Sequence, residues 1–411
     1  MSAGDGNLGA GGQNRMARIR ERYGVLRRRG EAIWARRYAR LAIVLVAAAA
    51  VILFPYLFQP GSTFLFDLVE AVAFVVMALG LNVVVGFAGL LDLGYVAFFA
   101  IGAYTIGWFG SGFFAYVNHT KGIHILTSGL ASTLPGIHIN FVLVAIAAAG
   151  FAALGGAIIG LPTLRLRGDY IAIVTLAFGE IIHDVAVNGQ TLHIGHNATL
   201  TAGRQGITPV DPVQLPGLNP FDPLNLRPWY WVALGMVAIV LLVNVRLRDS
   251  RLGRAWVALR EDEVAAASMG VPLVKTKLMA YATGAAFGGM SGAFIASYLN
   301  TVNADQFAFS FSIFVLAMVI LGGLGSIWGV VLGAIVLSFI NTWLIPKVIP
   351  DLSSKIGIKV DLTSLSYGIF GFLLVIMMVL RPQGLLPERR RKLEFVEHVG
   401  TGPTDMSAER V

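Results

Sequence analysis

The sequence of 411 residues contains no cysteine. Disulfide bonds, thiolate catalysis and cysteine-ligated metal sites are therefore excluded. Charged residues are also scarce, because they form 13% of the chain, about half the share usual in soluble domains. The phosphate-binding motif Gly-x-x-x-x-Gly-Lys-Ser/Thr is absent, so the chain does not bind ATP in that way. A nucleophile elbow and a convincing catalytic pair are absent too. We therefore expect neither enzymatic activity nor a bound cofactor.

Long apolar runs dominate the chain instead. Hydrophobic residues form 56% of the sequence, and the mean hydropathy is +0.73. The runs are continuously apolar, whereas the strands of a membrane β-barrel alternate polar and apolar residues. The sequence therefore predicts an all-α polytopic membrane protein with about ten transmembrane helices, or about eight if short spans do not cross. The expected spans lie near 41–58, 64–86, 93–111, 141–161, 169–188, 229–245, 278–299, 310–324, 328–345 and 364–380.

The positive charges predict the orientation of these spans. If the N- and C-termini are cytoplasmic, 25 of the 31 lysines and arginines fall on the cytoplasmic side, as the positive-inside rule requires. Anionic membrane lipid explains the net charge of +8, so no nucleic-acid partner is invoked. We expect a multi-pass protein of the bacterial plasma (inner) membrane.

The same analysis divides the chain into three parts. Residues 1–40 form a basic cytoplasmic N-terminal segment, and residues 387–411 form a cytoplasmic tail. We expect 41–58 to be a retained span rather than a signal peptide, because the segment before it is too long. The transmembrane domain, 41–386, includes a cytoplasmic loop, 246–277, and outward loops at 112–140 and 189–228.

The charged loop 246–277 is the most informative segment. Helix-forming residues run from Arg254 to Met269, and Gly270 with Pro272 predicts the helix end. One interpretation is a solvated amphipathic helix. The other is a coupling helix that docks on a soluble ATPase, with small alanines permitting close approach and charges fixing the register. The candidate coupling residues are Arg254, Arg260, Glu261, Glu263, Ala266, Ala267 and Gly270.

Several motifs resemble a known family. Glu263 to Gly270, which reads Glu-Val-Ala-Ala-Ala-Ser-Met-Gly, resembles the EAA loop of ABC importer permeases. The chain further resembles the LivM-type permeases of branched-chain amino-acid ABC importers. The segments that carry this second resemblance are Leu79–Gly89 with Ala97–Tyr104, Leu164–Glu180, Arg260–Gly270, and Val319–Gly329 with Arg381–Gly384.

The resemblance implies a function and a set of partners. The chain would provide the path for branched-chain or other neutral amino acids by alternating access. The implied partners are a second homologous permease, two cytoplasmic ATPases that bind ATP and Mg, and an extracytoplasmic solute-binding protein. Two departures from the family concern the substrate. The long outward loop has Thr201-Ala-Gly203 where the family often has Thr-Gly-Gly, and His183 stands where many relatives carry arginine.

Polar residues inside the spans are candidates for the transport path, because burying them in lipid is unfavourable. Glu180 and His183 are three residues apart and share a helix face. They form either a path-lining or gating pair, or a structural contact with a neighbouring helix. Asn82, Asp92 and Thr175 are weaker candidates of the same kind.

Glycines offer another type of candidate. Gly284, Gly288 and Gly292 recur every four residues, as do Gly325, Gly329 and Gly333, which favours close helix packing. Gly322 and Gly323 have an alternative interpretation, a helix break that exposes backbone carbonyls to a cavity.

Other functions remain open from the sequence. The same family includes ABC permeases for urea or short amides. An ion-gradient-driven secondary amino-acid transporter would leave the 246–277 helix unexplained, and a membrane enzyme would lack a catalytic constellation. The residues His183, Asp184, His193 and His196 superficially resemble metal ligands, but their spacing matches no zinc pattern, so we expect no metal.

Overall fold

The computed structural model describes residues 37–115, 122–163, 166, 169–194, 198–215, 220–343 and 384–386, together with 368, 371, 372, 375, 376 and 379. Most of the N-terminal segment 1–40, most of the expected span 364–380 and the whole tail 387–411 lie outside the described residues. The chain divides into two units, residues 1–59 and 60–411.

The first unit contains a single described α-helix. Helix α2 spans Arg37–Leu53 and overlaps most of the first expected span, 41–58. A short 3-10 helix, η1 (Phe54–Leu57), follows it, with Pro55 near its start. Proline lacks an N–H and does not continue an α-helix, which accounts for the change of helix type.

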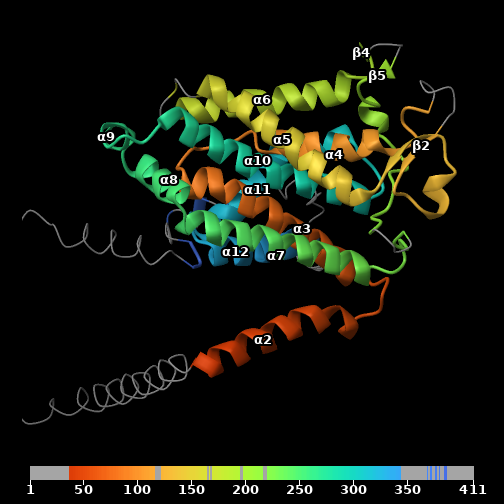
Figure 1. Cartoon of the computed structure of the whole chain (residues 1–411), viewed down its shortest axis with the longest axis horizontal. Coiled ribbons are helices and arrows are strands. Elements are labelled where there is room, and N and C mark those ends of the chain that lie inside the picture. Colours follow the sequence, from red (N-terminus) through yellow and green to blue (C-terminus); the bar gives the residue numbers. More distant parts are fainter. Residues whose placement is uncertain are drawn as a thin grey trace, which may run out of the picture. The chain divides into compact units, whose positions relative to one another are not determined.

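The second unit is a bundle of helices (Figure 1). Its helices are α3 (Thr63–Leu81), the π-helix η2 (Asn82–Phe87), α4 (Val96–Phe109), α5 (Phe141–Thr163), α6 (Asp169–Asn188), α7 (Arg227–Asp249), α8 (Arg251–Glu261), α9 (Glu263–Ser268), α10 (Leu273–Tyr298), α11 (Phe309–Gly322) and α12 (Ile327–Phe339). The 3-10 helices η3 (Gly129–Ser132), η4 (Gly203–Gln205) and η5 (Ala304–Phe307) lie in the connections. Helices therefore occupy each of the first nine expected spans, and the protein is a multi-pass helical membrane protein.

Length and hydropathy divide these helices into two groups. Within the part of the chain that the structure describes, five segments are long and apolar enough to cross a membrane: 63–87, 141–163, 170–188, 227–249 and 273–298. The helices at four other expected positions, α2, α4, α11 and α12, are apolar but shorter. A count of about ten spans stays a prediction.

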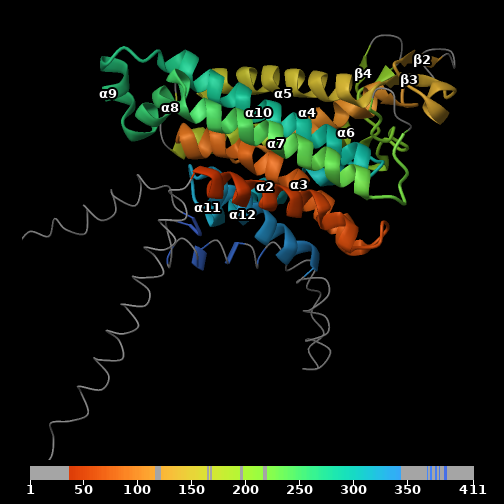
Figure 2. The same ribbon diagram turned by 60° about the horizontal axis from the view of Figure 1, so that its bottom comes forward.

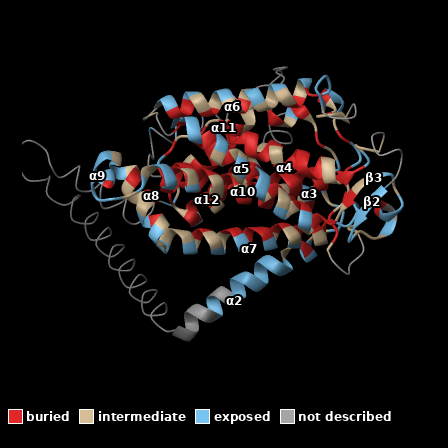
Figure 3. Cartoon of the chain, turned by 45° about the horizontal axis from the view of Figure 1, so that its top comes forward, coloured by how far each residue is buried: buried red, intermediate tan, exposed pale blue. Residues whose placement is uncertain are grey.

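Helix α10 forms the centre of the bundle and packs against α3, α4 and α5. The hydroxyl of Tyr95 donates to the carbonyl oxygen of Gly284 at 2.7 Å. At Gly292, a Cβ atom would clash with the backbone of Phe99. The glycines of α10 therefore permit close helix contact, which confirms the packing interpretation for this set. Figure 3 shows that buried residues concentrate on α3, α4 and α10, while α6 and α7 show more exposed residues.

Two connections near one end of the bundle interrupt the helical pattern. Helix α3 continues into the π-helix η2. Helix α11 ends at Gly322, Gly323 has φ +113°, and α12 begins at Ile327. Glycine adopts positive φ without a Cβ clash, which explains the break. The helix break expected at Gly322 and Gly323 is confirmed, whereas Gly325 lies in the turn rather than on a helix face with Gly329.

Short strands lie in the connecting segments at the opposite end, a feature that the all-α expectation did not include. Strands β1 (Gly110–Ser111), β3 (Gly136–Ile139) and β2 (Gly122–Ile125) form one sheet in that order, with β1 and β3 antiparallel and β2 and β3 parallel. Strands β4 (His193–Ile194) and β5 (Ala198–Thr199) form an antiparallel pair. Figures 1 and 2 both place α8 and α9 at the end of the bundle away from these strands.

Candidate functional site

The 246–277 segment folds as two helices rather than one. Helix α8 ends at Glu261 and α9 begins at Glu263, so the expectation of one helix from Arg254 to Met269 is wrong. The cause is Asp262, which is extended at φ −154° and ψ 114°. Its Oδ1 accepts hydrogen bonds from the backbone N–H groups of Val264 at 2.8 Å and Ala265 at 2.9 Å. An aspartate in this geometry caps a new helix, and the chain turns there.

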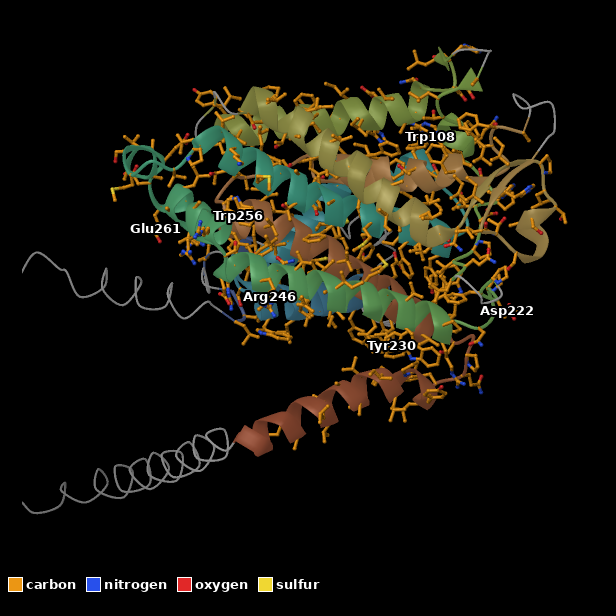
Figure 4. All side chains as sticks on the ribbon, in the orientation of Figure 1. Trp108, Asp222, Tyr230, Arg246, Trp256 and Glu261 are labelled. Carbon is orange, nitrogen blue, oxygen red and sulfur yellow. The ribbon has the colours of Figure 1, made fainter. Side chains whose placement is uncertain are left out.

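Two long side chains of helix α8, Trp256 and Arg260, form hydrogen bonds with the bundle. Trp256 is fully buried, and its Nε1–H donates to the carbonyl oxygen of Thr276 at 2.9 Å. Arg260 donates from Nη1 to the carbonyl oxygen of Gly86, in the π-helix η2, at 2.8 Å. Figure 4 shows Trp256 and Glu261 on the same short helix, with Glu261 exposed at its far end. Arg260 thus contacts the chain's own transmembrane helix.

Helix α9 has an inner and an outer face. On the inner face, Ala266 is buried, and Oε1 of Glu263 accepts a hydrogen bond from Nζ of Lys277 at 2.7 Å. On the outer face, Val264 is 62% exposed and Met269 is 84% exposed. Among the candidate coupling residues, three turn inward, namely Arg260, Glu263 and Ala266, whereas Arg254, Glu261, Ala267 and Gly270 are exposed. A coupling role for all seven stays a prediction.

The candidate path residue Asn82 meets the break between α11 and α12. Asn82 is fully buried, and its Oδ1 accepts a hydrogen bond from the backbone N–H of Gly325 at 2.9 Å. Its Nδ2 has no hydrogen-bond partner among the described residues. The structure thus brings Asn82 next to the predicted glycine cluster, and the hydrogen bond to Gly325 stabilises the turn between α11 and α12.

Gly322 is the last residue of α11, and Gly323 follows it in this break. The carbonyl groups nearby already accept backbone hydrogen bonds. The backbone N–H of Leu385 donates to the carbonyl oxygen of Leu321 at 2.9 Å, and that of Leu386 donates to Gly322 at 3.2 Å. The carbonyl oxygen of Gly323 accepts from Ser326 at 3.0 Å. The carbonyl groups of Gly322 and Gly323 therefore each accept one backbone hydrogen bond, and their exposure to a transport cavity stays a prediction.

Two further candidates, Asp92 and Thr175, come together at the start of α4. Both are almost completely buried. Oδ1 of Asp92 accepts a hydrogen bond from the backbone N–H of Gly94 at 2.9 Å, and Oγ1 of Thr175 accepts one from Leu93 at 3.0 Å. Oδ2 of Asp92 has no hydrogen-bond partner among the described residues. The Leu93–Thr175 bond joins α6 to the connection that precedes α4, and the Asp92–Gly94 bond lies within that connection.

Glu180 and His183 lie one turn apart on α6, and both are half-buried. The Nδ1 atom of His183 is buried without a hydrogen-bond partner in the described part of the chain. Their role in the path stays a prediction. The described residues also contain no group of three or more His, Cys, Asp or Glu side chains that could hold a metal ion, and His196 lies outside them.

A cavity of about 360 Å³ lies between α3, α10, η5 and α11, toward the end of the bundle that carries the strands. None of the candidate path residues lines it. The lining residues combine one carboxylate from α3, amide side chains and aromatic rings: Glu70, Phe74, Phe99, Ile295, Leu299, Asn303, Asp305, Gln306, Ala308, Ser310, Phe311, Phe314 and Asn341. Sequence reasoning missed Glu70, although a carboxylate seven residues into an apolar span is a recognisable signal.

The connecting segments at this end are held together by an ion pair. Nδ1 of His138, on β3, lies 2.7 Å from Oδ2 of Asp211. The hydrogen bond to Asp211 raises the pKa of His138 above its ordinary value, although burial acts in the opposite direction. Gln214 and Ser128 make a second side-chain contact between the same two loops.

Comparison with known proteins identifies the family of this chain. The family described as the branched-chain amino acid transport system permease component matches residues 64–378. The chain belongs to this permease family. The permease is 36% identical over 379 residues to the high-affinity branched-chain amino acid transport system permease protein LivM of Salmonella typhimurium, which covers 86% of this chain and 76% of the relative.

Two further relatives agree. The protein of the same name from Escherichia coli is 36% identical over 382 residues, or 88% of the permease and 78% of the relative. The probable branched-chain amino acid transport permease protein LivM of Methanocaldococcus jannaschii is 28% identical over 334 residues, or 76% of the permease and 90% of the relative. No solved structure shows a significant match. The resemblance drawn from the sequence motifs is confirmed, and these relatives are transport permeases rather than enzymes.

Proposed function

We propose that this permease is the membrane subunit of an ATP-driven importer that moves branched-chain amino acids by alternating access. The observation that carries the proposal is helix α9, which presents exposed Val264 and Met269 at the end of the bundle away from the strands. Exposed apolar side chains beside small and charged residues suit docking into a groove of a soluble protein. The ATPases supply ATP and Mg binding, and this permease binds neither.

The contacts of α8 and α9 support transmission of movement into the bundle. The Glu263–Lys277 pair joins α9 to α10, and Arg260 joins α8 to the π-helix η2. Asn82, the first residue of η2, in turn holds Gly325 in the break between α11 and α12. A displacement of α8 and α9 by the ATPases would thus reach three transmembrane elements through direct hydrogen bonds.

The two ends of the bundle suggest the remaining partners. We propose that an extracytoplasmic solute-binding protein docks on loops 112–140 and 189–228, which the His138–Asp211 pair holds together. A second homologous permease and two ATPases would complete the assembly in a bacterial plasma membrane, with about ten spans and both termini of this permease in the cytoplasm. The urea, short-amide and ion-gradient alternatives have no observation in their favour, since all three relatives bear the name of branched-chain amino acid permeases.

The first test is purification of the complex in mild detergent, followed by mass spectrometry of the proteins that accompany the permease. Two ATPases and a second permease are expected. Reconstitution with the solute-binding protein should then give leucine uptake that requires ATP. Uptake that follows an ion gradient and ignores ATP would overturn the proposal.

A crosslinking experiment tests which end of the helix bundle contacts the ATPases and which end contacts the solute-binding protein. Because the permease has no cysteine, Ala267→Cys and Ser132→Cys each introduce a single thiol into the chain. Both positions are exposed, one on α9 and the other in η3. With a thiol-reactive photocrosslinker, Ala267→Cys should crosslink to an ATPase and Ser132→Cys to the solute-binding protein. The opposite pattern would contradict the proposed orientation.

A further inference from the structure

The cavity beside Glu70 combines three chemical environments in one space. Its volume of about 360 Å³ lies within the range of small-ligand sites. Glu70 provides a carboxylate on one wall, helix α11 begins on another, and phenylalanine rings form a third. Each environment matches one part of an amino acid.

The carboxylate of Glu70 favours binding of a cationic group. Glu70 lies on α3 inside an apolar span, and none of the described residues forms a salt bridge or a hydrogen bond with it. The carboxylate of Asp67, one turn earlier, adds to the negative potential. The other acidic residue of the cavity wall, Asp305, is 58% exposed and lies 3.8 Å from Arg204. Glu70 is therefore the acceptor best suited to a ligand ammonium group.

The start of α11 supplies the complementary group. Its first turn reaches the cavity through Ser310 and Phe311. The N-cap residue is Ala308, which has no side-chain oxygen and makes no side-chain capping bond. The N-terminus of a helix of this length carries partial positive charge and N–H donors, both of which favour a carboxylate. The amide groups of Asn303 and Gln306 line the same region.

The third wall is apolar and built from packed aromatic rings. The ring centroids of Phe74 and Phe311 lie 5.5 Å apart, and those of Phe99 and Phe311 lie 5.2 Å apart. Phe74 and Phe99 are almost completely buried. A branched aliphatic side chain placed against these rings would remove apolar surface from water, which stabilises the bound state.

From these three walls we infer that the cavity between α3, η5 and α11 is a solute site of the permease, where Glu70 binds the ammonium group and the α11 N-terminus binds the carboxylate of a branched-chain amino acid. The inference rests on the proposed transport function and specifies where the solute sits. The site lies near the strand end of the bundle, at the end of α10 and the start of α11. It therefore receives the solute on the side where the solute-binding protein is proposed to dock.

The first experiment measures protection of a thiol in the assembled transporter. Ser310→Cys places the only thiol of this chain in the cavity wall. Thr342→Cys is the matched control, because Thr342 is also half-buried but lines a different pocket. Leucine should slow maleimide labelling of Ser310→Cys and leave labelling of Thr342→Cys unchanged. Equal effects at both positions, or none at Ser310→Cys, would overturn the inference.

The second experiment tests the ammonium contact. Adding Glu70→Gln to Ser310→Cys should raise the leucine concentration for half-protection by about tenfold or more, as expected for loss of a charge-assisted hydrogen bond. The 2-oxo acid that corresponds to leucine, which lacks the ammonium group, should protect weakly in both backgrounds. Equal protection by the oxo acid and by leucine would contradict the role of Glu70.

Uptake in proteoliposomes separates this inference from the proposed function. Glu70→Gln should lower leucine uptake about tenfold, while ATP hydrolysis stimulated by the loaded solute-binding protein persists. Asp67→Asn removes a charge one turn away from Glu70, on a side chain that does not line this cavity, and should lower uptake much less than Glu70→Gln. If the unaltered transporter shows ATP-dependent uptake and Glu70→Gln matches it, only the solute site is wrong. If the unaltered transporter shows no ATP-dependent uptake, the proposed function fails first.

Discussion

The ammonium group of Lys277, at the start of α10, donates a hydrogen bond to the carboxylate of Glu263 on α9 over 2.7 Å. Lys277 is 1% exposed, so the pair is largely shielded from water. A residue that sequence reasoning assigned to the ATPase interface thus holds the coupling segment to a central helix. The consequence is that substitution of Glu263 acts on the permease itself before it acts on a partner.

We expect Glu263→Gln to destabilise the permease by about 3 kcal/mol, because it leaves a buried lysine charge without its partner. The purified protein should show a lower Tm. Asp249→Asn is the control, since the Arg248–Asp249 pair is exposed and contributes little. Replacing both members, with Glu263→Met and Lys277→Met, should recover most of the loss, because no charge remains buried. An unchanged Tm in Glu263→Gln would show that the pair does not anchor α9.

We expect Arg260→Ala to reduce the number of leucine molecules imported per ATP hydrolysed. The substitution removes the bond to the Gly86 carbonyl, worth about 1.5–3 kcal/mol for a charged donor, and disconnects α8 from η2. The measurement is the ratio of uptake to ATP hydrolysis in proteoliposomes. Arg251→Ala, an exposed position on the same helix, should leave the ratio unchanged. Equal ratios in both variants would argue against transmission through η2.

We expect Gly270→Leu to weaken association with the ATPases. Gly270 has φ +84°, and a side chain in this left-handed conformation adds about 1–2 kcal/mol of strain. A Cβ atom there would meet no other atom, so crowding inside the permease does not explain a loss. Gly235→Leu is the control, because Gly235 is equally uncrowded but lies on α7. Copurification of ATPases measures the effect, and equal recovery with both variants would contradict the prediction.

The His138–Asp211 pair predicts a dependence on pH at the strand end. The pKa of His138 is raised in the folded protein, chiefly by its hydrogen bond to Asp211. The folded state therefore binds the proton more tightly than the unfolded state, and this stabilisation is complete below the ordinary histidine pKa of about 6.5. This stabilisation disappears as the pH rises through the raised pKa of His138.

Hydrogen exchange of strands β1 and β3 at several pH values measures this effect. Protection should fall on the alkaline side in the unaltered permease, and the fall should be absent in Asp211→Asn. His193→Gln, which changes an exposed histidine in strand β4, should behave like the unaltered protein. A pH dependence that survives Asp211→Asn would exclude the ion pair as its source.

Hydrophobic runs were sufficient to locate helices in the first nine expected spans, because burial in lipid requires long apolar segments whatever their neighbours. The glycine cluster likewise indicated the break between α11 and α12, since Gly323 and Gly325 have positive φ, which favours glycine. Asp262 was misjudged because helix propensity is a weak guide: the same side chain fits a helix surface or caps a new helix.

The functional residues were harder to predict, because their roles depend on tertiary partners. Arg260 and Glu263 occur in a motif that resembles an ATPase-contacting loop, yet their partners Gly86 and Lys277 lie on other helices. Glu70 escaped notice because a single carboxylate in an apolar run does not reveal which groups from other helices face it. Its significance emerges only when α11 and the phenylalanine rings are placed beside it.

The hydrogen bonds from Leu385 and Leu386 to the carbonyls of Leu321 and Gly322 have a consequence for biosynthesis. During translation, α11 and α12 leave the ribosome before the residues that complete their turn. Until Leu385 and Leu386 arrive, these two backbone acceptors have no protein donor in an apolar setting, which is unfavourable. We therefore expect the packing of this turn to be complete only when the chain has been made through Leu386. A truncated chain that stops before this point would leave the turn open to quality-control proteases.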